Sequence, residues 1–141
     1  MEAVCRGARE AGGAPVGVTV EAFQFRGGPN RYVAREIRAT DLYERTRRLI
    51  DSADAFLVLE GKAGTLAEVS FVWALNRAGL LDGPCPVFLY GAGWEPLYRF
   101  LERSGALTEV AGNGAGCTEW ITDLELLQER ILAYGQERTR A

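Results

Sequence analysis

The sequence predicts an α/β fold built on a mostly parallel sheet. Two unbroken apolar runs, at residues 55–59 and 86–90, are typical of strands that are buried on both faces. Segments with helical spacing of apolar residues alternate with the predicted strands, and this alternation indicates parallel pairing. Because 141 residues are enough for one domain with a sizeable core, we expect a single domain over residues 1–135 and a polar tail at 136–141.

The first part of the chain predicts a helix followed by two strands. Residues 1–12 read as a helix that ends at a pair of glycines. The β-branched segment 15–20 predicts a strand, 21–31 a loop, and 32–39 a minor strand. The expected apolar face of the helix consists of Val4, Ala8 and Ala11.

A second helix is predicted from about residue 41 to Ser52, with Thr40 or Asp41 as its N-cap. Arg45 lies beside its apolar side and reads, from spacing alone, as an edge arginine with a solvated head. The expected buried stripe consists of Leu42, Thr46, Leu49, Ile50 and Ala53.

Three further helices and two further strands are predicted after the run at 55–59. A helix at 65–79 is apolar nearly all round, so we expect it to be buried or packed against a second subunit. A helix at about 94–104 follows the run at 86–90, and residues 117–121 predict a last strand. The final helix is expected to be capped by Thr122 or Asp123 and to face inward with Leu124, Leu127 and Ile131.

Composition excludes several classes of function. The net charge of −3 gives no reason to expect nucleic acid or an anionic membrane as partner. The absence of histidine removes the Ser-His-Asp and Cys-His schemes. The three cysteines are widely spaced, so we expect buried thiols in a reducing cytoplasm and no disulfide or metal site. No segment is long and apolar enough to span a bilayer, and we find no signal-peptide pattern.

The connection from Glu60 to Thr65 is the strongest candidate site. Two glycines and Lys62, the only lysine in the chain, lie between a buried strand and a helix N-terminus. Backbone amides and the helix dipole make such a turn an anion site, and ligands of parallel sheets bind beyond the carboxyl ends of strands. The alternative is purely structural: Thr65 and Glu68 have the spacing of a capping box, and the glycines would only turn the chain.

At this point the residues resemble a known family. Residues 60–68, EGKAGTLAE, resemble the PGGxGTxxE motif of the LOG ("Lonely Guy") family, long called lysine decarboxylases. Residues 43–46 resemble its arginine-bearing segment, and further similarity extends from residues 6–13 through the helix near Trp94 to residues 121–123. The resemblance implies a Rossmann-like three-layer fold, a homodimer, no cofactor, and hydrolysis of the N-glycosidic bond of a nucleoside 5′-monophosphate.

The resemblance also implies roles for individual residues. Gly61, Gly64 and Thr65 would hold the phosphate, with Lys62 beside them, and Arg45 and Glu68 would be the catalytic pair. A carboxylate near the ribose stabilises the positive charge that glycosidic cleavage creates. Lysine decarboxylation is disfavoured, because Lys62 lies in a phosphate loop without ring-binding partners for pyridoxal phosphate.

The chain departs from the family pattern in three ways. Glu60 replaces the motif proline, Lys62 replaces the second glycine, and the strand–helix–strand unit with which family members begin has no counterpart before Met1. We therefore expect a truncated or separately encoded piece; re-pairing of the remaining strands and completion by a partner are the alternatives. For function, a nucleotide-binding or carrier protein is the alternative to an enzyme, and a scaffold in which Arg45 and Glu68 only pair is the third.

Overall fold

The computed structural model describes residues 1–21, 30–81, 85–107 and 118–140. The chain forms two compact units, Met1–Ser52 and Ala53–Ala141, and each is described by itself. Every strand pair in the described residues is parallel and helices accompany the strands in both units, which confirms the predicted α/β, Rossmann-like class. Cys117, with which the last predicted strand begins, and most of the loop expected at 21–31 lie outside the described residues.

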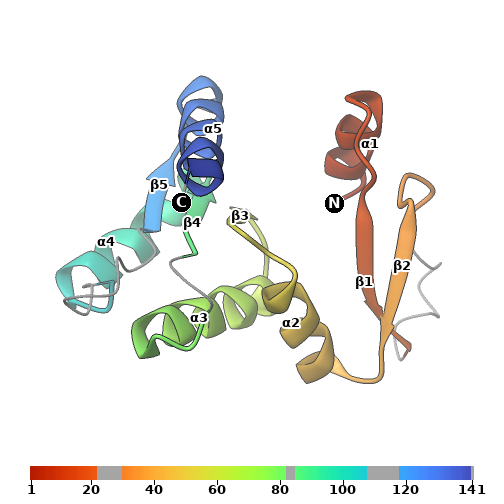
Figure 1. Cartoon of the computed structure of the whole chain (residues 1–141). Helices are drawn as coiled ribbons and strands as arrows, with labels where there is room; N and C mark the ends of the chain where they lie inside the picture. The colour runs from red at the N-terminus through yellow and green to blue at the C-terminus, as the bar shows by residue number, and fades with distance from the viewer. Residues whose placement is uncertain (22–29, 82–84, 108–117, 141) are drawn as a thin grey trace. The chain divides into compact units, whose positions relative to one another are not determined.

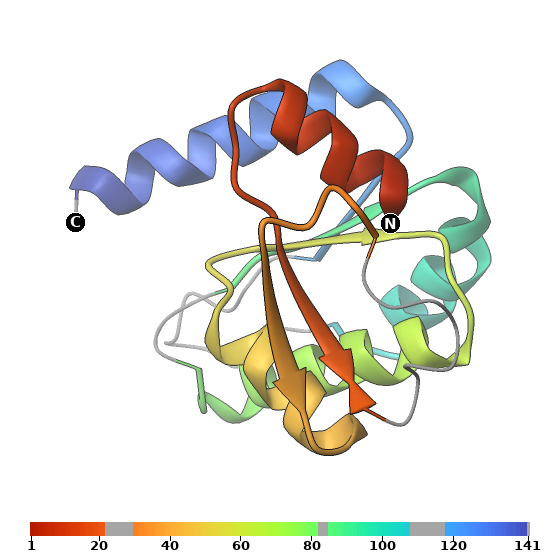
Figure 2. The same cartoon turned by 90° about the vertical axis from the view of Figure 1, so that its right-hand side faces the viewer.

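The first unit pairs two strands beside two helices (Figure 1). Val16 lies opposite Arg35 and Val20 opposite Ala39, so the expected minor strand is a full five-residue partner. The arrows of the two strands point the same way in Figure 2. The elements are α1 (Glu2–Glu10), β1 (Val16–Val20), β2 (Arg35–Ala39) and α2 (Leu42–Asp51).

Two expectations about burial in this unit were wrong. On α1 the buried residue is Cys5, whereas Val4 is exposed; cysteine behaves as a small hydrophobe and, with Ala8 three residues later, forms the inner side. On α2 Ile50 is buried as expected, but Leu42 is exposed because it is the first helical residue and lies at the open end of the stripe.

The second unit contains a three-stranded sheet in the order β3-β4-β5. The central strand β4 is the most buried, with Val87 and Leu89 fully inaccessible. Phe88 packs with Ile121 and Leu127 in a hydrophobic core. The elements are β3 (Phe56–Leu59), α3 (Ala63–Ala78), β4 (Val87–Tyr90), the short 3-10 helix η2 (Ala92–Trp94), α4 (Glu95–Arg103), β5 (Thr118–Ile121) and α5 (Leu124–Arg140).

The last helix is longer than expected. It continues past Gly135 to Arg140, so the residues expected to form a polar tail begin within the helix, where glutamine, glutamate and arginine are good helix formers. Leu127 is buried, but Leu124 and Ile131 are exposed. The 17-residue helix is about 25 Å long and the four-residue strands only about 13 Å, so α5 is longer than the strands of the sheet.

Candidate functional site

The connection from β3 to α3 begins its helix earlier than predicted. The carbonyl oxygen of Lys62 accepts a hydrogen bond from the amide of Leu66, so Lys62 is the N-cap and Ala63 the first helical residue. The capping box on Thr65 is therefore wrong: Thr65 is the third residue of the helix and cannot cap it.

Thr65 instead lies against Gly61. A Cβ atom on Gly61 would come within 2.1 Å of the Thr65 hydroxyl oxygen and 2.7 Å of its Cβ. No side chain other than hydrogen fits at position 61 unless Thr65 moves. The first motif glycine is thus required by the ligand-free fold.

Gly64 has no such requirement. It is the second residue of α3, and a Cβ there would meet nothing within 4 Å. Glycine inside a helix costs roughly 0.5–1 kcal/mol relative to alanine. The side chain of Lys62, the N-cap residue, makes no capping hydrogen bond, and the positive end of the helix dipole lies at this end of α3.

Glu68 lies on the same face of α3, because it follows Gly64 by four residues and Thr65 by three. Its side chain is half-buried, and Lys62 is exposed at the start of the helix. A carboxylate one turn from an open helix N-terminus suits a ligand that carries a phosphate at one end and a reacting sugar carbon next to it.

Glu60, the first residue after β3, does not form an ion pair with Lys62 among the described residues. Its Oε1 atom accepts a hydrogen bond of 2.8 Å from the amide of Gly93, in the turn that follows β4. Leu59 lies opposite Tyr90 in the sheet, so the two turns are neighbours. Sequence reasoning missed this contact, and the signal that could have found it is the Gly-Ala-Gly segment at 91–93.

Arg45 belongs to the first unit. Its Nε atom donates a hydrogen bond of 3.1 Å to the carbonyl oxygen of Val18 in β1. The amide of Arg35 in β2 donates to the carbonyl oxygen of Pro15, so the backbone groups of residue 15 face β2. Alternate residues of a parallel strand face the same neighbour, and Val18, three residues further on, therefore faces away from β2. Arg45 thus satisfies a backbone oxygen on the outer edge of β1.

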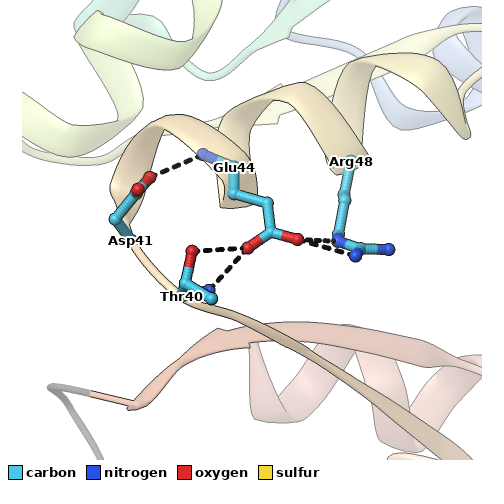
Figure 3. A network of polar contacts seen from close by, with 4 residues as sticks. All are labelled: Thr40, Asp41, Glu44 and Arg48. Carbon is cyan, nitrogen blue, oxygen red and sulfur yellow. Dashed lines mark hydrogen bonds and ion pairs between the residues drawn. The ribbon is translucent and has the colours of Figure 1, made fainter.

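A network of polar contacts holds the beginning of α2, which carries Arg45 (Figure 3). Asp41 caps the helix as predicted by accepting the amide of Glu44 at 2.8 Å. The Glu44 carboxylate accepts hydrogen bonds from the amide and hydroxyl of Thr40 and from the guanidinium of Arg48. These contacts, the Thr40 amide foremost, lower the pKa of Glu44 to about 2.

The structure therefore brings five of the six predicted site residues together on one connection. They are Gly61, Lys62, Gly64, Thr65 and Glu68. The sixth, Arg45, lies in the other unit, so its pairing with Glu68 stays a prediction. Within the described segments no three His, Cys, Asp or Glu side chains gather as metal ligands would, and no helix is long and apolar enough to cross a membrane.

Comparisons with known proteins agree on one family. The family described as "Possible lysine decarboxylase" matches residues 1–119. A protein of Mycobacterium tuberculosis (strain ATCC 25618 / H37Rv) is 38% identical over 85 residues, which cover 60% of this chain and 45% of the relative. A protein of Rhodococcoides fascians is 27% identical over 105 residues, which cover 74% and 53%. Both relatives are named cytokinin riboside 5′-monophosphate phosphoribohydrolase, and the chain spans about half the length of each.

The match of the family model covers most of the chain and agrees with the fold and with the β3–α3 connection. The protein therefore belongs to the possible lysine decarboxylase family, that is, the LOG family.

Proposed function

We propose that this chain is a LOG-type phosphoribohydrolase, which hydrolyses the N-glycosidic bond of a nucleoside 5′-monophosphate to free base and ribose 5-phosphate. The observation that carries the proposal is Gly64: a helical glycine with open space above its Cα, in the uncapped first turn of α3. A phosphate approaching the first amides of the helix accounts for both features. The names of the two relatives support the same reaction.

In this mechanism the phosphate lies over Gly61, Gly64 and Thr65, with Lys62 adding a full positive charge. The ribose then extends along α3 toward Glu68. The bond between the anomeric carbon and the base nitrogen breaks, and its electron pair leaves with the base. Water adds to the anomeric carbon and loses a proton, and the base takes up a proton. The Glu68 carboxylate stabilises the positive charge on the ribose and orients the water.

Arg45 is proposed to grip phosphate or ribose oxygens and to hold Glu68 in place. The hydrogen bond from its Nε atom to Val18 supports this role, because it fixes the side chain to β1. No metal or organic cofactor enters this reaction.

We further propose a homodimer that works in the cytoplasm. The exposed side of α3 is apolar, with Phe71 half-exposed and alanines at helical spacing beside it, and such a surface is typical of a subunit contact. The buried free thiols of Cys5 and Cys85 suit a reducing compartment. A shift from dimer to monomer in Phe71→Lys, measured as mass in solution, tests the contact.

The function is tested by incubating the purified protein with AMP and with a cytokinin riboside 5′-monophosphate and measuring free base and ribose 5-phosphate. We expect release by the wild type and none by Glu68→Gln, which should still bind AMP in calorimetry. Binding of AMP without release by the wild type would favour the second candidate, a nucleotide-binding or carrier protein. The substitutions at Glu60 and Lys62 within the motif speak for that candidate.

A further inference from the structure

Glu60 makes a contact that its position in the motif does not require. Its carboxylate lies against the turn after β4, where the amide of Gly93 donates to Oε1 at 2.8 Å. A Cβ on Gly91 would come within 2.5 Å of Oε1, and one on Gly93 within 2.9 Å of Cδ. Both glycines are therefore needed for the carboxylate to fit, so the turn and Glu60 are matched to each other.

The turn that Glu60 contacts is itself tied to the rest of the sheet. Gly91 has a positive φ of 124°, its amide donates to Ile121, and its carbonyl oxygen accepts the indole N–H of Trp120 at 2.9 Å. Glu60 thus joins the end of β3 to a turn that is already fixed to β5.

The contact also determines where the charge of Glu60 lies. Gly93 is in η2, which leads directly into α4, so the carboxylate lies at the positive end of a helical segment. Neither Glu60 nor Lys62 takes part in an ion pair within the described part of the chain. The ammonium of Lys62 is thus not neutralised by the carboxylate two residues before it.

We propose that Glu60 is a positioning residue for phosphate binding, an inference that rests on the function proposed above. Its carboxylate fastens the β3–α3 connection to the turn after β4, which fixes Lys62 and the first amides of α3 in the orientation that receives the phosphate. A proline at this place would stiffen the turn through its own ring. Glu60 stiffens it through a tertiary hydrogen bond.

The test compares Glu60→Ala and Glu60→Gln with the control Glu95→Gln. The control also removes one negative charge at the start of α4, but Glu95 forms an ion pair with Arg99, and the Gly93 amide donates to Glu60 instead. Five quantities are measured for each variant: the hydrogen-exchange rate of the Gly93 amide by NMR, the melting temperature, the dissociation constant for AMP, and kcat and KM for base release.

We expect Glu60→Ala to speed exchange at Gly93 and to raise the dissociation constant and KM for AMP about fivefold each, as for one partly exposed hydrogen bond. The value of kcat should change less, because Glu60 does not touch the reacting carbon. Glu60→Gln should recover most of the affinity, since its amide oxygen still accepts from Gly93. Glu95→Gln should leave all these quantities unchanged.

Three results would overturn the proposal. Unchanged exchange at Gly93 in Glu60→Ala would show that the contact does not hold the turn. Tighter AMP binding by both Glu60 variants would mean that the charge only repels phosphate. A lowered melting temperature with unchanged AMP affinity would mean a purely structural role. A wild type that binds neither AMP nor inorganic phosphate would refute the proposed function, and with it any role of Glu60 in phosphate binding. In that case the exchange rate of the Gly93 amide in Glu60→Ala still shows whether the carboxylate holds the turn.

Discussion

Replacing Gly64 by alanine separates what the fold needs at this position from what a bound phosphate needs. The new methyl group would meet nothing within 4 Å, and Gly64 does not have a positive φ. Removing a glycine from a helix stabilises it by roughly 0.5–1 kcal/mol. For a chain of this size that corresponds to a rise in melting temperature of about 2–4 °C.

The same methyl group would occupy the space through which a phosphate reaches the first amides of α3. Losing one charge-assisted hydrogen bond of about 1.5 kcal/mol weakens binding about tenfold, so the dissociation constant for AMP should rise by at least that factor. The expected outcome is therefore a more stable protein that binds its ligand less well. Calorimetric titration with AMP and thermal unfolding followed by circular dichroism measure the two effects on one preparation.

Gly61→Ala provides the matched comparison. Its methyl group would lie 2.1 Å from the Thr65 hydroxyl, so Thr65 must move, and overpacking of this kind costs about 1–3 kcal/mol. This variant should lose both stability and affinity. If Gly64→Ala raised the melting temperature but bound AMP as tightly as the wild type, the phosphate could not lie on this helix, and the proposed site would have to be abandoned.

Three further predictions follow from the described contacts. Lys62→Ala should weaken AMP binding more at low salt than at 0.5 M salt, because an exposed ammonium acts through screened charge; an equal loss at both salt concentrations would argue against a direct charge contact. Asn76→Ala removes two hydrogen bonds to the backbone of Cys85, at 2.9 and 3.4 Å, and should lower the free energy of unfolding by about 1–3 kcal/mol in denaturant titration; an unchanged midpoint would contradict this. Glu44 has a folded pKa of about 2, below its ordinary 4.5, so its contribution to stability is complete above pH 4.5 and is lost as the pH falls toward 2. The melting temperature should therefore fall more steeply with acid in the wild type than in Glu44→Gln, and parallel curves would disprove the role of its hydrogen bonds.

The parts of the fold that could be predicted are those with a strong local signal. The apolar runs before residues 60 and 91 became β3 and β4, and Asp41 became the N-cap of α2 as its residue type predicts. The beginning of α3 was predicted two residues late, because Thr65 and Glu68 have the spacing of a capping box and local spacing does not reveal that Thr65 packs on Gly61.

For the candidate site, too, the features with a local signal in the sequence could be predicted. Its glycines, lysine and glutamate lie consecutively in sequence, so the connection could be found from the motif alone. The contact of Glu60 with Gly93 was missed: the Gly-Ala-Gly segment signals a close approach at residues 91–93, but the partner lies 33 positions away and depends on the pairing of Leu59 with Tyr90. Which residues of α5 are buried could not be predicted either, because helical periodicity identifies an apolar side but not how far the sheet beneath it extends.

The hydrogen bond from Arg45 to Val18 links the outer rim of a strand to a side chain proposed for catalysis. An incoming β-strand laid along that rim would need the same oxygen for its own ladder, because parallel neighbours use every outward-facing carbonyl. An incoming amide and the guanidinium would therefore have to share the two lone pairs of this one oxygen. The edge of β1 at Val18 is thus already occupied in part by a side chain of its own unit.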